Sequence, residues 1–245
     1  MPTILPTELL FSNTLPGAGQ CSGPVVCGGV GMMQTRELSD VIYTAGKVFD
    51  NLRSGHLATL TFLENGDVTQ ISSRADLQLL QDLRDAAHIV VQYRAARKPV
   101  TAEAIVEVNA AMTRSAALYP GVFRTDDSNI GVATVYGDHR PAGTNLAGLR
   151  NLIRRAERES SASRQAAALF VLLAKAQPFG DGNKRTALLS ANILLGDSTV
   201  LAVPYEENNK GVSERFNDLL ARAYIFDEID NCVDYLVTYG IKMGR

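Results

Sequence analysis

The chain has 245 residues, 46% of them hydrophobic, and its 24 Lys and Arg nearly balance its 26 Asp and Glu, which leaves a formal charge of -2. This composition can fill a sizeable apolar core and excludes a disordered or fibrous chain. The near-neutral charge disfavours nucleic acid and anionic lipid as partners of the chain as a whole.

Cysteine use and the N-terminal residues bear on location. Cys21, Cys27 and Cys232 fit neither a metal knuckle nor paired disulfides, so we expect reduced thiols. The N-terminus has no basic segment before its apolar residues, and no later stretch approaches the roughly 20 apolar residues that span a bilayer. These features predict a cytoplasmic protein that is neither secreted nor inserted in a membrane.

In chain order, residues 1–35 are predicted to be an irregular N-terminal arm, because Gly, Pro and Ser are frequent there. Apolar residues spaced three and four apart then predict helices over residues 36–53 and 74–97. Between these helices, β-favouring residues flank Asn65 and Gly66, a pair suited to a tight turn, which predicts a β-hairpin over residues 56–72. Residues 36–99 would thus form an α/β extension, whose apolar faces either join the core or form a homodimer surface.

Residues 100–245 are predicted to form a mainly helical core. Thr101 is a suitable N-cap for the helix that follows it, because its side-chain oxygen can accept a backbone N–H of the first turn. Residues 119–143 carry Pro and Gly around a β-favouring middle and predict a loop with a short β-ribbon. Further helices are expected at residues 144–160, 163–176, 184–195, 213–224 and 230–239.

One segment of this core has the composition of an anion site. Pro, Gly, Asp and Asn interrupt two helical patterns at residues 178–183 and are followed at once by Lys184 and Arg185. Gly180 and Gly182 would let the backbone approach a ligand, and the N–H groups at the start of the next helix would point at it. Arg offers a fork of donors that matches phosphate oxygens, so a phosphate chain is the expected ligand. Asp181 could hold a Mg²⁺ shared with the phosphates.

This segment resembles the signature of the Fic/Doc (Fido) family, His-Pro-Phe-x-Asp/Glu-Gly-Asn-Gly/Lys-Arg. Residues 177–185 read Gln-Pro-Phe-Gly-Asp-Gly-Asn-Lys-Arg, and Lys184 is the form found in the Doc branch. Residues 119–124 resemble the segment that precedes the family's active site, and residues 129–142 resemble its β-flap. The resemblance covers roughly residues 100–240 and implies a mainly α, Fic-like helical bundle with a short β-hairpin flap.

The resemblance also implies an activity, namely transfer of AMP or phosphate from ATP with Mg²⁺ to a hydroxyl of a target protein. It assigns Asp181 to the metal, Asn183, Lys184 and Arg185 to the phosphates with Gly180 and Gly182, and Val135 and Tyr136 to the flap. In the family, the first residue of the signature is the histidine that acts as general base.

Gln177 takes the place of that histidine. An amide neither gains nor loses a proton near neutral pH, so it cannot act as the base, and the loss of a general base typically costs about 10²- to 10⁴-fold in rate. Leu188 stands where adenylylating relatives have a second arginine, and we find no match to the family's inhibitory Glu-containing helix. His139, predicted to lie on the flap, is a candidate replacement base, although a solvated loop histidine is the simpler interpretation.

Three functions stay open from the sequence. The first is a weakened nucleotidyl or phosphoryl transferase. The second is a Fic-like fold recruited to act on a small-molecule, biosynthetic substrate, with Gln177 positioning it and backbone N–H groups stabilising a developing oxyanion. The third is a non-catalytic binding protein that keeps the pocket without turnover.

Overall fold

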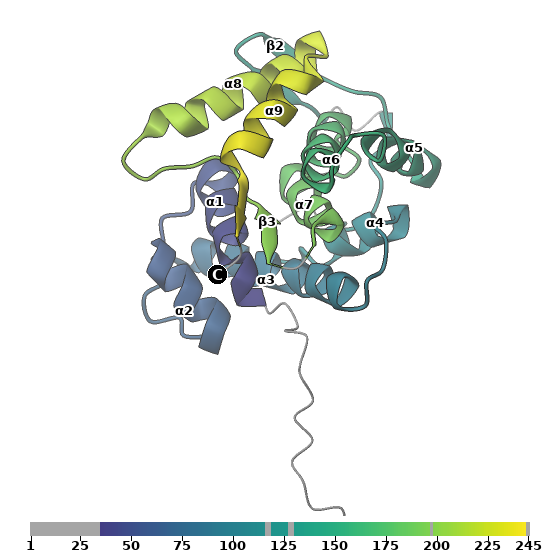
Figure 1. Ribbon diagram of the computed structural model, residues 1–245. Coiled ribbons are helices and arrows are strands. Elements are labelled where there is room, and N and C mark those ends of the chain that lie inside the picture. The colour runs from purple at the N-terminus through teal and green to yellow at the C-terminus, as the bar shows by residue number, and fades with distance from the viewer. Residues whose placement is uncertain (1–34, 116–118, 127–129, 197, 244–245) are drawn as a thin grey trace, which may run out of the picture. The chain divides into compact units, whose positions relative to one another are not determined.

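The computed structural model describes residues 35–115, 119–126, 130–196 and 198–243. Except for Thr35, the predicted arm over residues 1–35 lies outside the described residues, as do Cys21 and Cys27. Within them the chain forms nine α-helices, short 3-10 turns and two two-stranded sheets, and it is mainly α as the sequence predicts (Figure 1).

The N-terminal elements are helical. They comprise a 3-10 turn (η1, Thr35–Leu38), α1 (Ser39–Asp50), α2 (His56–Asn65) and α3 (Arg74–Ala95). The Ser73 side chain caps α3 by accepting a hydrogen bond from Asp76 N. The apolar faces of α1 and α3 are buried in the same core as the rest of the chain, with residues such as Val41, Leu80 and Leu83 fully covered.

The predicted hairpin over residues 56–72 is wrong, because residues 56–65 form the helix α2. Gly66 does adopt the left-handed conformation that the Asn-Gly pair favours, at φ 77°, but there it ends a helix and does not turn a hairpin. The hydroxyls of Thr59 and Thr61 bond back to the carbonyls of Gly55 and Leu57, which accommodates these β-favouring residues in a helix. The extension is therefore helical in its described elements, without the β component.

The core follows in chain order. Thr101 caps α4 (Ala102–Ala110), accepting a hydrogen bond from Ala104 N at 3.1 Å as predicted. The ribbon consists of antiparallel β1 (Val132–Thr134) and β2 (Gly137–His139), with Ala133 opposite Asp138. The remaining helices are α5 (Leu146–Ala156), α6 (Ala162–Ala176), α7 (Asn183–Ala191) with the 3-10 turn η3 (Asn192–Leu194), α8 (Lys210–Phe226) and α9 (Ile229–Tyr239).

A second small sheet was not expected from the sequence. Strand β3 (Thr199–Leu201) pairs antiparallel with β4 (Ile241–Met243), which follows α9. The Asn192 side chain supports this sheet, because it donates to Leu201 O and accepts from Leu201 N, both at 2.9 Å. Helices α8 and α9 therefore lie between the two paired strands in the sequence.

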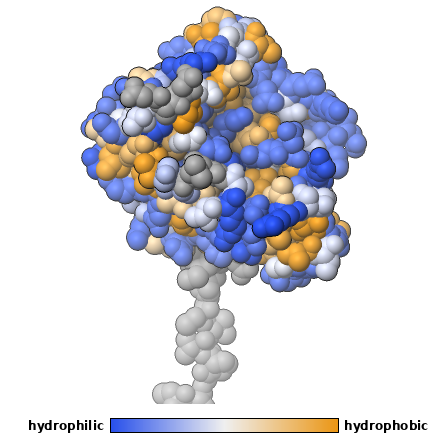
Figure 2. Space-filling view, turned by 180° about the vertical axis from the view of Figure 1, so that it is seen from behind, coloured by the Kyte–Doolittle hydropathy of each residue, from blue (hydrophilic) through white to orange (hydrophobic). Residues whose placement is uncertain are grey.

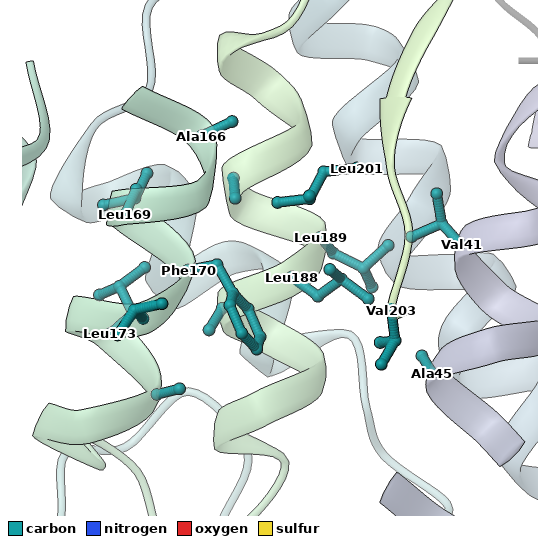
Figure 3. Close-up of a cluster of buried hydrophobic side chains, with 14 of the residues drawn as sticks. Val41, Ala45, Ala166, Leu169, Phe170, Leu173, Leu188, Leu189, Leu201 and Val203 are labelled. Atoms are coloured by element: carbon teal, nitrogen blue, oxygen red, sulfur yellow. The ribbon is translucent and has the colours of Figure 1, made fainter. Parts of the chain in front are cut away.

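Helix α7 lies inside the bundle and contacts α1, α3, α4 and α6. Figure 3 shows Leu188 and Leu189 of α7 between Phe170 of α6 and the β3 side of the core, with Val41 of α1 beyond. At the C-terminal end of this core helix, the buried Arg94 of α3 donates to the carbonyls of Asn192 and Thr199 at 3.4 and 3.0 Å and also to Gly196 O. Helix α7, whose N-terminus forms part of the predicted anion site, is thus held on several sides.

On the side that Figure 2 shows, the hydrophobic residues of the described part of the chain form separate patches among hydrophilic ones. Among the described helices, none is both long and apolar enough to span a membrane.

Candidate functional site

The predicted anion loop connects α6 to α7 through two residues in the left-handed region. Gln177 ends α6 at φ 47°, and Gly182 precedes α7 at φ 70°. Between them Phe179 is fully buried and stacks on Phe123, which lies in the segment before the flap. The first intrahelical hydrogen bond of α7 runs from Thr186 N to Gly182 O at 2.8 Å, so the backbone N–H groups of residues 183–185 precede the helical ladder. The loop therefore presents a helix N-terminus, as the sequence predicts.

The Asn183 side chain holds this loop together. Its Oδ1 accepts a hydrogen bond from Phe179 N at 2.9 Å, and its Nδ2 donates to Phe179 O at 2.9 Å and to Gln177 Oε1 at 3.2 Å. The side chain is buried. The resemblance assigns Asn183 to the phosphates, and in this geometry the backbone N–H is the group of Asn183 that remains for them.

Gln177 is likewise committed to the fold. Its Nε2 donates to Ala174 O at 2.6 Å, its Oε1 accepts from Asn183, and the residue is buried. Burial raises the pKa of Tyr224, and the neighbouring Gln177 amide lowers it by a smaller amount. The Gln177 amide thus serves as a structural hydrogen-bonding group.

A pocket of about 220 Å³ lies over the loop. It brings together seven residues that the sequence singled out, namely Gln177, Gly180, Asp181, Gly182, Asn183, Lys184 and Arg185. Its other walls come from α1 and from the segment that enters the flap, namely Phe49, Asp50, Ile130, Gly131 and Val132. The predicted site is therefore one cavity, completed by the N-terminal extension.

Four charged side chains surround this pocket, two cations and two carboxylates. Burial lowers the pKa of Lys184, whose Nζ lies 5.0 Å from the ring centroid of Phe49, while Asp50 opposes this shift. Burial also raises the pKa of Asp50, against the lowering by Arg185 and Lys184, and Asp50 Oδ2 accepts no hydrogen bond within the described residues. The formal charges of Lys184, Arg185, Asp50 and Asp181 cancel.

Arg185 is held mainly by the scaffold. Its side chain is 4% exposed, with Nη1 donating to Ser115 Oγ at 2.9 Å and Nη2 to Ser115 O at 3.4 Å. Its Nε is 3.6 Å from Asp50 Oδ2, and its Nη2 is 3.8 Å from Asp181 Oδ1. The guanidinium thus borders the pocket in an orientation that Ser115 sets.

Asp181, the residue assigned to Mg²⁺ by the resemblance, carries an exposed carboxylate. Among the described residues only its Oδ1 is engaged, by Gly182 N at 2.6 Å and by Arg185, so that Oδ2 remains for a cation. The described residues contain no group of three or more His, Cys, Asp and Glu side chains placed to hold a metal. A Mg²⁺ at Asp181 would therefore take its other oxygen ligands from phosphates and water, as this ion commonly does, and the loop is compatible with it.

A second, larger pocket of about 760 Å³ adjoins the first between the flap and α8. The two pockets share Val132 and Lys184, and the second adds Val48, Ala133, Thr134 and Val135 with the α8 residues Glu214, Asn217, Asp218, Leu220, Ala221 and Tyr224. Its volume is in the range of pockets that bind small organic ligands. Together the pockets offer a charged end and a less polar end on either side of Lys184.

The two flap residues predicted from the sequence, Val135 and Tyr136, lie in different environments. Val135 lines the larger pocket and is 85% exposed, whereas the Tyr136 hydroxyl bonds to Asp218 and its ring packs against Phe226. Tyr136 therefore fastens the tip of the flap to α8.

His139, the candidate replacement base, borders neither pocket. Its Nε2 lies 2.7 Å from Lys175 O, and its ring stacks on Tyr224 with centroids 5.0 Å apart. His56 lies 2.8 Å from Asp40 Oδ1, and His88 is exposed on α3. In the part of the chain that the structure describes, no histidine faces the anion loop.

Several residues that shape the site were not predicted from the sequence. Arg124 donates to Gln177 O and to Pro141 O and Ala142 O, so it ties the anion loop to the segment after the flap. Asn109 of α4 donates to Asp181 O at 3.1 Å and to Thr186 Oγ1 at 2.9 Å. Asp50, Ser115 and Tyr224 belong to this group too. Arg124 ends the segment 119–124 that the sequence pointed to, although its own role was not predicted. The others stand in no recognisable local motif, and only the packing of distant elements brings them to the loop.

Comparison with known proteins shows what this chain is similar to. The model of the Fic/DOC family matches residues 99–195, which include the loop, β1, β2 and α4 to α7. The chain's fold is similar to that of a Fic-domain-containing signaling protein from Bacteroides thetaiotaomicron, at a TM-score of 0.63 and 16% identity, covering 82% of this chain and 81% of that one. It is also similar to a fragment of Fic-1 from C. elegans, at a TM-score of 0.59 and 16% identity, covering 85% of this chain and 61% of that fragment. Among curated proteins, none matches the sequence.

Proposed function

We propose that this chain binds a nucleoside triphosphate with Mg²⁺, because residues 99–195 match the model of the Fic/DOC family. The phosphates would occupy the pocket over the anion loop, and the nucleoside would occupy the larger pocket beside α8. Transfer of AMP or phosphate from this ligand to a hydroxyl is the proposed activity, weakened relative to enzymes that have a base at position 177.

The observation that carries this proposal is the pair of adjoining pockets. A charged cavity of about 220 Å³ with a helix N-terminus at its floor shares Lys184 and Val132 with a less polar cavity of about 760 Å³. A nucleotide has the same division, with anionic phosphates at one end and an aromatic base at the other. Lys184 lies where the two parts of such a ligand would join.

Several residues of the loop have a role in this arrangement. The backbone N–H groups of residues 183–185 would donate to phosphate oxygens, assisted by the helix dipole. Lys184 would add a positive charge, and Asp181 would hold Mg²⁺, which supplies charge neutralisation to the phosphates when bound. Asn183 and Gln177 would keep the loop in shape through their mutual hydrogen bond.

One step of this transfer, removal of the proton from the attacking hydroxyl, has no residue assigned to it. Gln177 cannot accept a proton, and its two amide atoms bond to Ala174 O of α6 and to the Asn183 side chain. His139 is engaged with Lys175 O and borders neither pocket. These contacts favour one further candidate, a binding protein that holds the nucleotide without turnover.

Calorimetry with ATP and Mg²⁺ tests the binding. We expect saturable binding that weakens in Asp181→Ala when Mg²⁺ is present, with Asp230→Ala on the surface of α9 as the matched control. Folded protein that binds no nucleotide would overturn the proposed function.

A transfer assay separates the enzyme from the binding protein. ATP labelled at the α- or the γ-phosphate distinguishes AMP transfer from phosphate transfer, and fractionation shows whether the label joins a protein or a small molecule. We expect slow labelling that rises in Gln177→His by up to about 10² to 10⁴, the usual contribution of a general base. If the wild type transfers nothing and the variant gains activity, the chain is the binding protein.

A further inference from the structure

Arg185 is connected to helix α3 by a short chain of hydrogen bonds. The guanidinium Nη1 donates to Ser115 Oγ at 2.9 Å, and Ser115 Oγ donates to Asp82 Oδ2 at 2.8 Å. Asp82 belongs to the N-terminal extension and lies outside residues 99–195, which match the family. The chain of contacts thus joins the anion loop to a helix that comes before the matched region.

Asp82 is a firm anchor for this connection. It is fully buried, and its carboxylate accepts hydrogen bonds from the backbone N–H groups of Thr113, Arg114 and Ser115, the last at 2.6 Å. Arg114 adds an ion pair at 3.0 Å. Hydrogen bonds to a carboxylate are shorter and stronger than neutral ones, so the turn at residues 113–115 is fixed against α3. The position of Ser115 Oγ is fixed with it.

Two carboxylates near the Arg185 guanidinium also attract it. Asp50 Oδ2 lies 3.6 Å from its Nε and Asp181 Oδ1 lies 3.8 Å from its Nη2. Both distances exceed that of a hydrogen bond, whereas the contact with Ser115 Oγ does not. Without Ser115 Oγ, the guanidinium would move toward these carboxylates, because their charge attracts it. It would then neutralise the residue assigned to Mg²⁺ and turn from the ligand.

We infer that Ser115, fixed by Asp82, is a positioning residue that holds Arg185 in the orientation needed for the phosphate chain. This inference rests on the proposed nucleotide function, since it assigns the polyphosphate as the group that Arg185 faces. It makes helix α3 of the extension a working part of the site.

The test compares three variants in calorimetry with two probes, ATP with Mg²⁺ and adenosine. Ser115→Ala removes the hydroxyl, Ser115→Thr keeps it, and Ser190→Ala removes a buried hydroxyl of α7 that has no partner within the described residues. We expect Ser115→Ala to weaken ATP binding about tenfold, the loss of one charge-assisted hydrogen bond. Adenosine affinity should stay unchanged, because the nucleoside does not reach Arg185. Ser115→Thr should restore most of the ATP affinity, and Ser190→Ala should match the wild type.

The outcomes separate the two ideas. Wild-type protein that binds neither probe overturns the proposed function, and the positioning role falls with it. Wild-type binding of ATP with equal binding by Ser115→Ala overturns the positioning role alone. Equal loss for ATP and adenosine in Ser115→Ala also overturns it, since a general packing defect would weaken both. Should Ser115→Ala fail to fold, Arg185→Lys replaces it, because Lys lacks the forked donors and should give the same selective loss.

Discussion

The anion loop at residues 177–185 and the flap at residues 132–139 border the same pockets, but their side chains are held in opposite ways. In the loop, Asn183 and Gln177 bond to each other and to the backbone, and both are buried. In the flap, Val135 is 85% exposed, while Tyr136 contacts α8 and His139 contacts both α6 and α8. The side chains of the loop thus bond to one another, whereas those of the flap bond to neighbouring helices.

Arg124→Ala should have the largest effect on this comparison, because Arg124 bonds to the loop and to the segment that follows the flap. Removing the buried guanidinium leaves the carbonyls of Gln177, Pro141 and Ala142 without their donor. We expect the free energy of unfolding to fall by about 3 kcal/mol. Urea unfolding measures this change, and a loss under about 1 kcal/mol would show that the loop and the flap do not depend on Arg124.

Asn183→Asp tests the rigidity of the loop alone. The new carboxylate oxygen would face Phe179 O and Gln177 Oε1, two acceptors, where Nδ2 now donates. We expect a loss of about 2 kcal/mol in the free energy of unfolding and weaker ATP binding. Asn208→Asp, in the exposed turn before α8, is the control and should leave both unchanged. Wild-type behaviour of Asn183→Asp would mean that the amide is not the loop's support.

Gly182→Ala separates backbone strain from ligand binding. A Cβ at φ 70° costs about 1 to 2 kcal/mol, and relief of that strain would displace the N–H groups that begin α7. Gly66→Ala carries a similar strain, at φ 77°, at the end of α2 and far along the chain from the loop. Both variants should lose stability, whereas only Gly182→Ala should lose ATP affinity. Equal ATP affinity in the two variants would argue against the helix N-terminus as the phosphate site.

Asp50→Asn tests the wall that the extension contributes. Burial raises the pKa of Asp50 in the folded state, so its ionised form destabilises the fold above the usual carboxyl range. Stability of the wild type should therefore fall as pH rises from that range through the raised pKa, and the variant should lack this fall. At pH 7 we expect the variant to gain on the order of 1 kcal/mol in the free energy of unfolding. Urea unfolding at several pH values measures the difference.

The pKa of Asp67 is shifted in the opposite direction to that of Asp50, so Asp67→Asn serves as the reference variant. A hydrogen bond from Thr69 N lowers the pKa of the exposed Asp67, so its carboxylate stabilises the fold above the usual range and this contribution is lost in acid. The two variants should differ in sign at neutral pH. A loss of stability in Asp50→Asn would show that its ion pair with Arg185 outweighs the cost of burial.

Val135→Ser should have the smallest effect on stability, and it tests the flap in the way that the preceding variants test the loop and the pocket wall. The side chain is largely exposed, so the free energy of unfolding should change by less than about 0.5 kcal/mol. Adenosine affinity is the informative readout, because Val135 lines the larger pocket. A large loss of stability would show that the flap is as rigid as the loop.

The sequence predicts features that depend on local patterns. The apolar spacing identifies α3, Thr101 identifies the start of α4, and the motif identifies the loop. The Asn65-Gly66 pair misleads, because a left-handed residue ends a helix as readily as it turns a hairpin. Strand β3 could not be matched with β4, since the partners are far apart along the chain and only three residues long.

The same limit applies to the site. The motif predicts which loop residues surround the anion pocket, and the described structure brings them together. The motif does not show that Gln177 and Asn183 bond to each other, since this depends on the fold of the turn. It also gives no sign of Asp50, Ser115 or Arg124, because each reaches the loop from a different element.

Arg94, at the far end of α7, has an electrostatic consequence for the pocket. A helix carries about half a positive charge at its N-terminus and half a negative charge at its C-terminus. The Arg94 guanidinium donates to carbonyls that follow α7, so its positive charge offsets the negative end. The opposite end then acts on the pocket almost as an isolated partial positive charge. An approaching anion would feel the attraction of one pole of the helix without the usual cancellation from the other.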